Sequence, residues 1–182
     1  MKPNWFIGWP ATLPAEWLAD LAPPPRFRVF HPGDLHATIA FLGGVSESAA
    51  RHAWATLPPI LGGPFEATWG GIVAMGPPRR YSALAAELDT PTRALRAQMA
   101  TLQPKLLGAA GARPARHPPR PHVTIARPQR RASEAQRARG LEWAAGLTLP
   151  VLTTPIDKVA LFTWSANRKE RLFQIVEERA LG

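Results

Sequence analysis

The spacing of apolar positions changes repeatedly along the chain, and these changes predict a mixture of strands and helices. Short runs rich in aromatic and β-branched residues indicate strands, whereas Leu95, Met99, Leu102 and Leu106 recur at the spacing of a helix. Strands or extended segments are predicted at residues 4–9, 26–30, 36–43, 65–75, 122–127, 149–152, 158–164 and 171–177. Helices are predicted at residues 14–21, 46–57, 90–107 and 133–145. Residues 81–88 suit either a helix or a strand.

Residues at the ends of these segments support the boundaries. Ser46 and Ser133 are expected N-caps of two helices, and Thr90 precedes a third helix with Pro91 at its first position. The pair Gly70-Gly71 predicts a bulge or bend in the strand that contains it. The last two predicted strands are separated by a short basic turn and should form a hairpin.

Two of the predicted strands begin with the same pattern of a histidine, any residue and a threonine. The first reads His-Ala-Thr-Ile-Ala-Phe-Leu-Gly from His36, and the second reads His-Val-Thr-Ile-Ala-Arg from His122. Because residues i and i+2 of a strand project from one face, His36 shares a face with Thr38, and His122 shares one with Thr124. The opposite face of each strand is predicted to be core, formed by Ala37, Ile39, Phe41, Val123 and Ile125.

The order of elements around the two motifs repeats. Each motif strand is followed by a loop, a helix with a serine cap, and another strand. This repetition predicts a duplicated α+β fold in which antiparallel sheets in two pseudo-symmetric lobes flank a central cleft, with helices on the outside. No linker divides the chain, so residues 1–182 are expected to form a single domain.

The charge of the chain favours a polyanionic partner. There are 22 Lys and Arg residues against 13 Asp and Glu, a formal net charge of +9. This balance points to nucleic acid first and to a membrane surface second. A coding bias that raises Arg, Ala and Pro together is the alternative explanation, and the 21 prolines fit it.

The composition also indicates the cellular compartment of the protein. The chain contains no cysteine, which fits the cytoplasm, and no apolar run is long enough for a signal peptide or a membrane span. We therefore expect a cytoplasmic monomer without a membrane or protein partner.

A metal site is the other natural interpretation of paired histidines. Zinc sites usually draw on three or four ligands at short local spacings. Neither motif has a cysteine, a second histidine or a carboxylate at ligand spacing. Asp34 lies two residues before His36 and could support it, but Arg120 holds the corresponding place before His122. No metal and no cofactor is predicted.

Two imidazoles that face one another across a cleft suit general acid–base chemistry. An ordinary histidine pKa of about 6.5 lets one ring act as base and the other as acid near neutral pH. The two threonine hydroxyls suit hydrogen bonds to anionic oxygens, because no carboxylate accompanies both motifs as a nucleophilic triad would require. With cationic residues nearby, the expected substrate is a phosphate ester.

These motifs carry a resemblance to a known family. His36-x-Thr38 with Phe41-Leu42-Gly43, and Pro121-His122-x-Thr124 with Arg127, resemble the two-histidine (2H) phosphoesterase superfamily. Within it, the chain is most similar to the RNA 2′,3′-cyclic phosphodiesterases, also called 2′-5′ RNA ligases. The resemblance implies metal-independent opening of an RNA 2′,3′-cyclic phosphate end to a 2′-phosphate, with reversible 2′-5′ joining as a minor activity.

The resemblance also implies roles for individual residues. His36 would be the proton donor and His122 the proton acceptor, while Thr38, Thr124 and Arg127 would bind the phosphate. Strict alternation along the second motif strand puts Arg127 on the face opposite His122, so it must lie beyond the strand end or on a bulge. Further RNA contacts are expected among basic loop residues, namely Arg79, Arg80, Arg113, Arg116, His117 and Arg120.

Two other functions remain open at the level of the sequence. One is a non-catalytic RNA-binding module on the same scaffold, although both motifs are intact. The other is a 2H phosphodiesterase that acts on small nucleotide cyclic phosphates.

Overall fold

The computed structural model describes residues 2–59, 61–89 and 92–182, and they form the predicted α+β fold. The strands are β1 Trp5–Pro10, β2 Phe27–Val29, β3 His36–Gly43, β4 Phe65–Ala74, β5 Leu84–Leu88, β6 His122–Pro128, β7 Thr153–Ile156, β8 Lys158–Trp164 and β9 Phe173–Ala180. The helices are α1 Ala15–Asp20, α2 Glu47–Ala55, α3 Thr92–Ala109 and α4 Glu134–Ala145, with a 3-10 turn η1 at Pro32–Asp34. The predicted cap Thr90-Pro91 lies outside the described residues.

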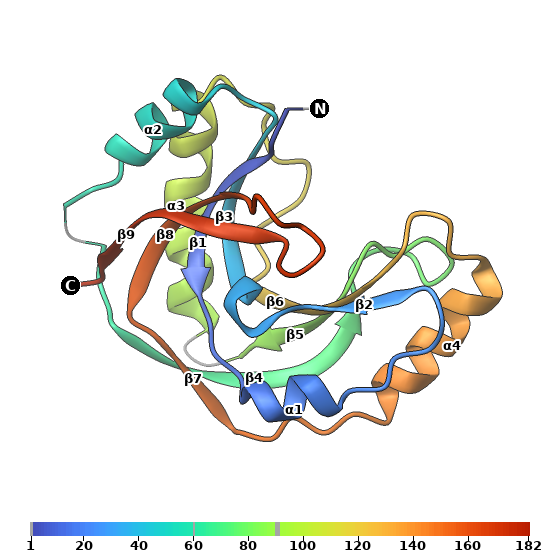
Figure 1. The fold of residues 1–182 in the computed structure, drawn as a ribbon. Coiled ribbons are helices and arrows are strands. Elements are labelled where there is room, and N and C mark those ends of the chain that lie inside the picture. Colours follow the sequence, from blue (N-terminus) through green and yellow to red (C-terminus); the bar gives the residue numbers. More distant parts are fainter. Residues whose placement is uncertain (1, 60, 90–91) are drawn as a thin grey trace.

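The antiparallel strands follow the order β7-β4-β5-β6-β3-β1-β8-β9, and β2 pairs with the outer part of β6. The two motif strands, β3 and β6, are therefore central neighbours with three strands beyond each. A single registered pair, Ala37 with Val123, joins them. The sheet curls between α2 and α3 on one side and α1 and α4 on the other (Figure 1).

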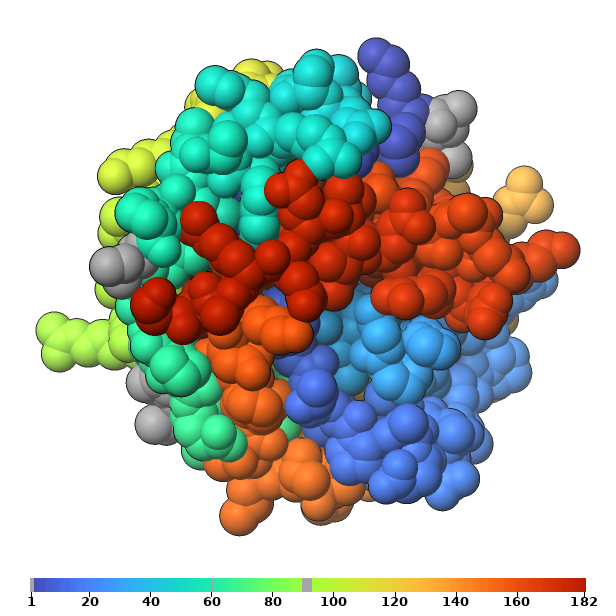
Figure 2. Space-filling view, turned by 60° about the vertical axis from the view of Figure 1, so that its left-hand side comes forward, coloured from blue at the N-terminus to red at the C-terminus, as the bar shows by residue number. Residues whose placement is uncertain are grey.

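The core lies between the sheet and the helices. Helix α3 packs against β3 and α2, and α4 packs against β4. Aliphatic and aromatic side chains such as Ile7, Trp9, Ile39 and Leu95 are completely buried there. The C-terminal strands cross one face of the molecule between α2 and the N-terminal segments, which ties both ends of the chain to the same body (Figure 2).

Most predicted boundaries agree with the structure. The hydroxyl oxygens of Ser46 and Ser133 accept hydrogen bonds from backbone N–H groups of the helices they precede. The pairing of β4 with β5 shifts register between Trp69 and Ile72, where Gly70-Gly71 predicted a bulge. Residues 84–88 form a strand, and β8 and β9 form the expected hairpin.

The predicted strand at residues 149–152 is wrong. The strand that pairs with β4 begins at Thr153. Of the preceding residue, Leu152, the carbonyl accepts a hydrogen bond from the Trp69 N–H at 2.9 Å, but the side chain is 85% exposed. Pro150 lies inside the predicted run and cannot donate a ladder hydrogen bond. The observed strand instead buries Thr154 and Ile156, and its Pro155 is tolerated because β7 lies at the edge of the sheet.

Candidate active site

The junction of β3 and β6 brings the two motifs together. Ala37 and Val123 are the middle residues of the two motifs, they pair with one another, and both are fully buried. Their flanking residues therefore project from the opposite face of the sheet. Because the strands are antiparallel, this register places His36 across from Thr124 and His122 across from Thr38.

The same irregularity occurs in both motif strands. In β3 the register shifts where Ile7 pairs with Ala40 but Gly8 pairs with Thr38. In β6 it shifts where Leu84 pairs with Ala126 but Ala85 pairs with Thr124. Each shift inserts one extra residue, so that two consecutive residues, Ile-Ala, point into the core in both strands.

Because of each bulge, the side chain that follows Ile-Ala projects from the same face of the sheet as the histidine and threonine of the motif. Arg127 thus lines the same cleft as His122, which resolves the conflict with strict alternation. Phe41 occupies the equivalent place in β3, and its side chain is 56% exposed in the cleft. The assignment of Phe41 to the core is therefore wrong, because that assignment assumed unbroken alternation along the strand.

Contacts from outside the ladder hold each bulge in place. The Gln103 side-chain amide on α3 donates a hydrogen bond to the Ile39 carbonyl at 2.9 Å. The Phe30 backbone N–H donates to the Ile125 carbonyl at 2.8 Å. Opposite the first bulge, Gly8 lies so close to β3 that a Cβ atom would stand 2.6 Å from the Ala37 carbonyl oxygen. These positions leave little freedom in the path of either motif strand.

Both histidines are oriented by the same local contact. The Nδ1 atom of His36 lies 2.6 Å from the backbone oxygen of Asp34, and Nδ1 of His122 lies 2.6 Å from that of Arg120. A carbonyl oxygen can only accept, so Nδ1 carries the proton in each ring. The neutral rings therefore keep Nε2 free to accept or, when protonated, to donate a proton.

Burial affects the two rings to different degrees. The His36 ring stacks on Phe6 with ring centroids 4.4 Å apart, and Phe162 and Phe173 lie at 5.0 and 5.4 Å. Loss of hydration in this aromatic surround lowers the pKa of His36 from 6.5 to about 4. Burial also lowers the pKa of His122.

Charged groups of both signs act on each ring. The Asp34 carboxylate acts to raise the pKa of His36, whereas the charge of His122 acts to lower it, so the two rings sense one another. The Arg120 guanidinium acts to lower the pKa of His122, and Glu87 acts to raise it.

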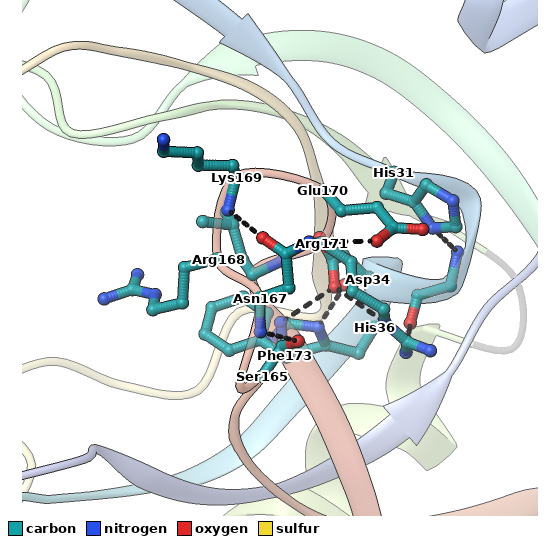
Figure 3. Close-up of polar contacts among 12 residues, drawn as sticks. His31, Asp34, His36, Ser165, Asn167, Arg168, Lys169, Glu170, Arg171 and Phe173 are labelled. Atoms are coloured by element: carbon teal, nitrogen blue, oxygen red, sulfur yellow. Dashed lines mark hydrogen bonds and ion pairs between the residues drawn. The ribbon is translucent and has the colours of Figure 1, made fainter.

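Asp34 supports the site through the backbone. Its carboxylate is fully buried and accepts hydrogen bonds from the N–H groups of Leu172 at 2.7 Å and Phe173 at 2.9 Å. Arg171 adds a bond from its guanidinium to the Gly33 carbonyl at 2.8 Å. Figure 3 shows these contacts joining η1 to the end of the β8–β9 loop and to the start of β9, where the Phe173 ring lies against that of His36.

The motif residues and the aromatic groups enclose a cleft of about 420 Å³. Its lining includes all five residues expected at the reaction centre, which are His36, Thr38, His122, Thr124 and Arg127. The cleft therefore combines two imidazoles, two hydroxyls and one guanidinium, a set that can bind an anionic group and move protons on either side of it.

Comparison with known proteins identifies the family. A family model described as the 2′-5′ RNA ligase superfamily matches residues 14–168. The chain belongs to this superfamily. No match is found among curated proteins.

Solved structures of similar fold cover nearly the whole chain. E. coli LigT complexed with 3′-AMP is 21% identical with a TM-score of 0.68, and the match covers 99% of both chains. TT0787 of Thermus thermophilus is 22% identical with a TM-score of 0.57, over 98% of this chain and 97% of that one. ATU0111 from Agrobacterium tumefaciens, a conserved protein of unknown function, is 15% identical with a TM-score of 0.52, over 96% and 84% of the two chains. At these identities the likeness shows the fold.

The basic residues expected to contact RNA in this superfamily member lie in different places. Arg80 lines a second cavity beside the cleft, whereas Arg79 lies on the adjacent exposed turn. Arg116 and His117 line a separate cavity beside α3. Arg120 forms an ion pair with Glu87 at 2.7 Å, so its charge is already engaged. Arg113 lines a cavity that also includes Phe41.

Several residues of the site escaped the sequence analysis. Gln103 and the aromatic side chains around His36 contact the motifs from distant parts of the chain, and no local spacing marks them. Arg28 and Arg168, which line the second cavity beside Arg127 and not the cleft itself, were also not predicted. The repeated Ile-Ala step after each threonine was the one local signal of the bulges.

Neither a metal centre nor a membrane-spanning helix occurs in the described part of the chain. Within residues 2–59, 61–89 and 92–182, no three His, Cys, Asp or Glu side chains gather as potential metal ligands. No helix in these ranges has the length and apolar character needed to cross a membrane.

Proposed function

We propose that this superfamily member is an RNA 2′,3′-cyclic phosphodiesterase that opens the cyclic phosphate to a 2′-phosphate. A water molecule attacks phosphorus while His122 accepts its proton through Nε2. The bond between phosphorus and the 3′ oxygen breaks as His36 donates a proton to that oxygen. Thr38, Thr124 and Arg127 bind the phosphate oxygens. When a 5′-hydroxyl group replaces water, the same groups join two RNA ends through a 2′-5′ bond.

One observation carries this proposal. The antiparallel register presents both imidazoles, each with a free Nε2, on the face that also holds both threonine hydroxyls. In-line displacement at phosphorus requires a base and an acid on opposite sides of the reacting group. A pair of histidines on adjacent strands, each across from the threonine of the other, suits that requirement.

Burial and nearby charges act on the protonation of both rings. Burial lowers the pKa of both rings, and an anion bound in the cleft would oppose this effect by stabilising an imidazolium. The Asp34 carboxylate adds to the stabilisation of a protonated His36. At His122, Arg120 opposes protonation and Glu87 favours it. The donor role of His36 and the acceptor role of His122 therefore rest on the resemblance of the two motifs to the superfamily, and the histidine variants described below test them.

A nucleotide ligand is compatible with the relatives. LigT has been crystallised in complex with 3′-AMP, and also with ATP and with NADP+. We infer that the cleft of this chain binds a nucleotide phosphate.

The decisive experiment uses a short RNA with a 2′,3′-cyclic phosphate end, incubated with the protein in EDTA. A 2′-phosphate product is expected. Loss of activity in EDTA that a divalent metal restores would refute the metal-independent mechanism. Binding without any turnover would favour the RNA-binding module, and turnover restricted to mononucleotides would favour the small-nucleotide enzyme.

The roles of the histidines are tested with His36→Ala, His122→Ala and, as a matched control, His52→Ala on the exposed face of α2. General acid or base help is worth about 10²–10⁴-fold, so both cleft variants should be impaired on the cyclic phosphate. On a p-nitrophenyl phosphodiester, whose leaving group needs no proton, His36→Ala should recover much of its relative activity and His122→Ala should not. The reverse pattern would exchange the donor and acceptor labels, and equal impairment on both substrates would assign the rings to binding.

A further inference from the structure

A second cavity of about 520 Å³ adjoins the cleft and is lined by arginines. It shares Ser82 and Arg127 with the cleft, so Arg127 stands at the boundary between the two. Among the described residues that line it, none is an aspartate or a glutamate. Its six arginines are Arg28, Arg80, Arg127, Arg130, Arg137 and Arg168.

These arginines come from four parts of the fold. Arg28 and Arg127 pair directly in the β2–β6 ladder, and Arg130 follows β6. Arg168 comes from the loop between β8 and β9, and in Figure 3 its side chain extends away from the contacts around Asp34. Arg80 and Arg137 complete the wall from the loop before β5 and from α4.

The positive charge of this cavity is not neutralised by the described part of the protein. Among the ion pairs of the described residues, none involves any of these six guanidinium groups. The only carboxylate of loop 165–172, that of Glu170, accepts a hydrogen bond from the Asn167 side chain. Burial, followed by the charges of Arg168 and Arg28, lowers the pKa of the Arg127 guanidinium. Such crowding of like charges is relieved when an anion binds among them.

Hydrogen bonds and ring contacts hold several of these arginine side chains in place. Arg28 donates to the backbone oxygens of Arg168 at 2.7 Å and Lys169 at 3.1 Å, and so fixes the loop against β2. The Arg168 guanidinium lies over the Trp164 ring, 4.1 Å from its centroid, which holds the group while leaving its charge uncompensated. Arg137 lies against Tyr81 in the same way, at 5.5 Å.

We propose that this arginine cavity binds the phosphate next to the reacting one in the same RNA strand, so that the preferred substrate carries at least two phosphates. The proposal rests on the proposed function, because it takes the cleft as the place of the terminal cyclic phosphate. In an RNA with a 2′,3′-cyclic phosphate end, the neighbouring phosphate is the one on the 5′ oxygen of the terminal nucleoside. A guanidinium matches the geometry of phosphate oxygens with two parallel hydrogen bonds.

The basic surface continues beyond the cavity. Arg130 and Gln129 also line a further hollow together with Arg26 and Arg131. A chain of nucleotides would therefore meet positive charge from Arg127 through Arg130 to Arg131. This path distinguishes an RNA end from an isolated nucleoside cyclic phosphate.

The test compares kcat/KM for three substrates that share the terminal nucleoside: its 2′,3′-cyclic phosphate, the same compound with a 5′-phosphate, and a dinucleotide with the cyclic end. A charge-assisted contact predicts a preference of roughly 10-fold or more for the dinucleotide over the plain nucleoside. Each phosphate contact should add a slope of about −0.7 to the dependence of log affinity on log salt. A preference confined to the 5′-phosphate monoester would assign the cavity to a terminal phosphate and overturn the assignment to an RNA strand.

Substitutions of single arginines test which residues produce the preference for the dinucleotide. Arg168→Gln and Arg130→Gln should each reduce the dinucleotide preference several-fold, while turnover of the nucleoside cyclic phosphate changes little. Arg139→Gln, on an exposed position of α4 outside the cavity, removes the same charge and should leave the preference intact. Circular dichroism shows whether each variant is folded. If Arg168→Gln unfolds because it loses the contact with Trp164, the test rests on Arg130→Gln alone.

The outcomes separate this proposal from the function on which it rests. Equal kcat/KM for all three substrates, or an equal effect of Arg139→Gln, would overturn the second phosphate site while leaving the phosphodiesterase intact. If the wild-type protein cleaves none of them, the proposed function fails. The dissociation constants of the uncleaved compounds, measured by calorimetry, then decide: tighter binding of the dinucleotide supports the site, and equal constants refute it.

Discussion

Protonation of His36 should make the folded protein lose stability as the pH falls. The ring is held in an aromatic surround that lowers its pKa to about 4, against 6.5 in the unfolded chain. The folded state therefore binds fewer protons than the unfolded state between these values. Stability is at its full value above pH 6.5, falls as the pH drops below it, and reaches its full loss below pH 4.

The size of this effect follows from the shift. Each pKa unit corresponds to 1.36 kcal/mol, so the 6.5-to-4 shift gives a full loss of about 3 kcal/mol. By pH 5 the loss from His36 is about 2 kcal/mol. Urea unfolding monitored by tryptophan fluorescence gives the free energy of unfolding at pH 7.5 and at pH 5. Because the two values are compared within each protein, the cost of the substitution itself cancels.

His36→Gln should abolish this part of the pH dependence, because glutamine does not titrate. His52→Gln is the matched control, since His52 lies exposed on α2, and it should lose as much stability as the wild type. Identical losses in wild type and His36→Gln would show that the ring is hydrated in the folded protein and that its aromatic surround does not lower its pKa.

Three further substitutions test the supports of the site. Gly8→Ala should destabilise the protein by about 1–3 kcal/mol and lower kcat, because the new Cβ meets the Ala37 carbonyl of the motif strand; thermal unfolding and turnover measure both. Asp34→Asn should cost about 2 kcal/mol in the free energy of unfolding, since an amide cannot accept both backbone N–H bonds as the carboxylate does, and unchanged stability would contradict that account. Phe41→Ala should lower kcat/KM on RNA by roughly 5-fold or more if the exposed ring stacks on a base, and equal kcat/KM would leave it without that role.

The sequence predicted most of the secondary structure, and the shared face of each His-Thr pair, because these depend on local patterns. Serine caps, glycine breaks and the alternation of His36 and Thr38 are properties of a few neighbouring residues. The failures at Phe41 and at residues 149–152 have a common cause. Both depend on how a strand pairs with its neighbours, and neither a bulge in β3 nor the edge position of β7 is fixed by the residues of the strand alone.

The arginine cavity lay beyond sequence reasoning for a similar reason. Arg28, Arg127 and Arg168 are far apart in the chain and meet only because β2 pairs with β6 and the loop between β8 and β9 docks on η1. The net charge predicted a polyanionic partner but could not say where on the surface it binds. The fold gathers guanidinium groups at one end of the cleft, and none of the ion pairs among the described residues involves them. This is the place that we propose for the polyanion.

The two halves of the site have the same backbone pattern, but two pairs of equivalent positions carry side chains of different chemistry. Two residues before each histidine stand Asp34 and Arg120, and after each bulge stand Phe41 and Arg127. Asp34 is buried and Arg120 is paired with Glu87, whereas Phe41 and Arg127 line the cleft. One half thus offers an aromatic ring and the other a guanidinium. Because an aromatic face suits a base and a guanidinium suits a phosphate, we expect this division to orient the proposed RNA substrate. The terminal base would lie toward Phe41, and the strand would leave the cleft past Arg127 into the arginine cavity.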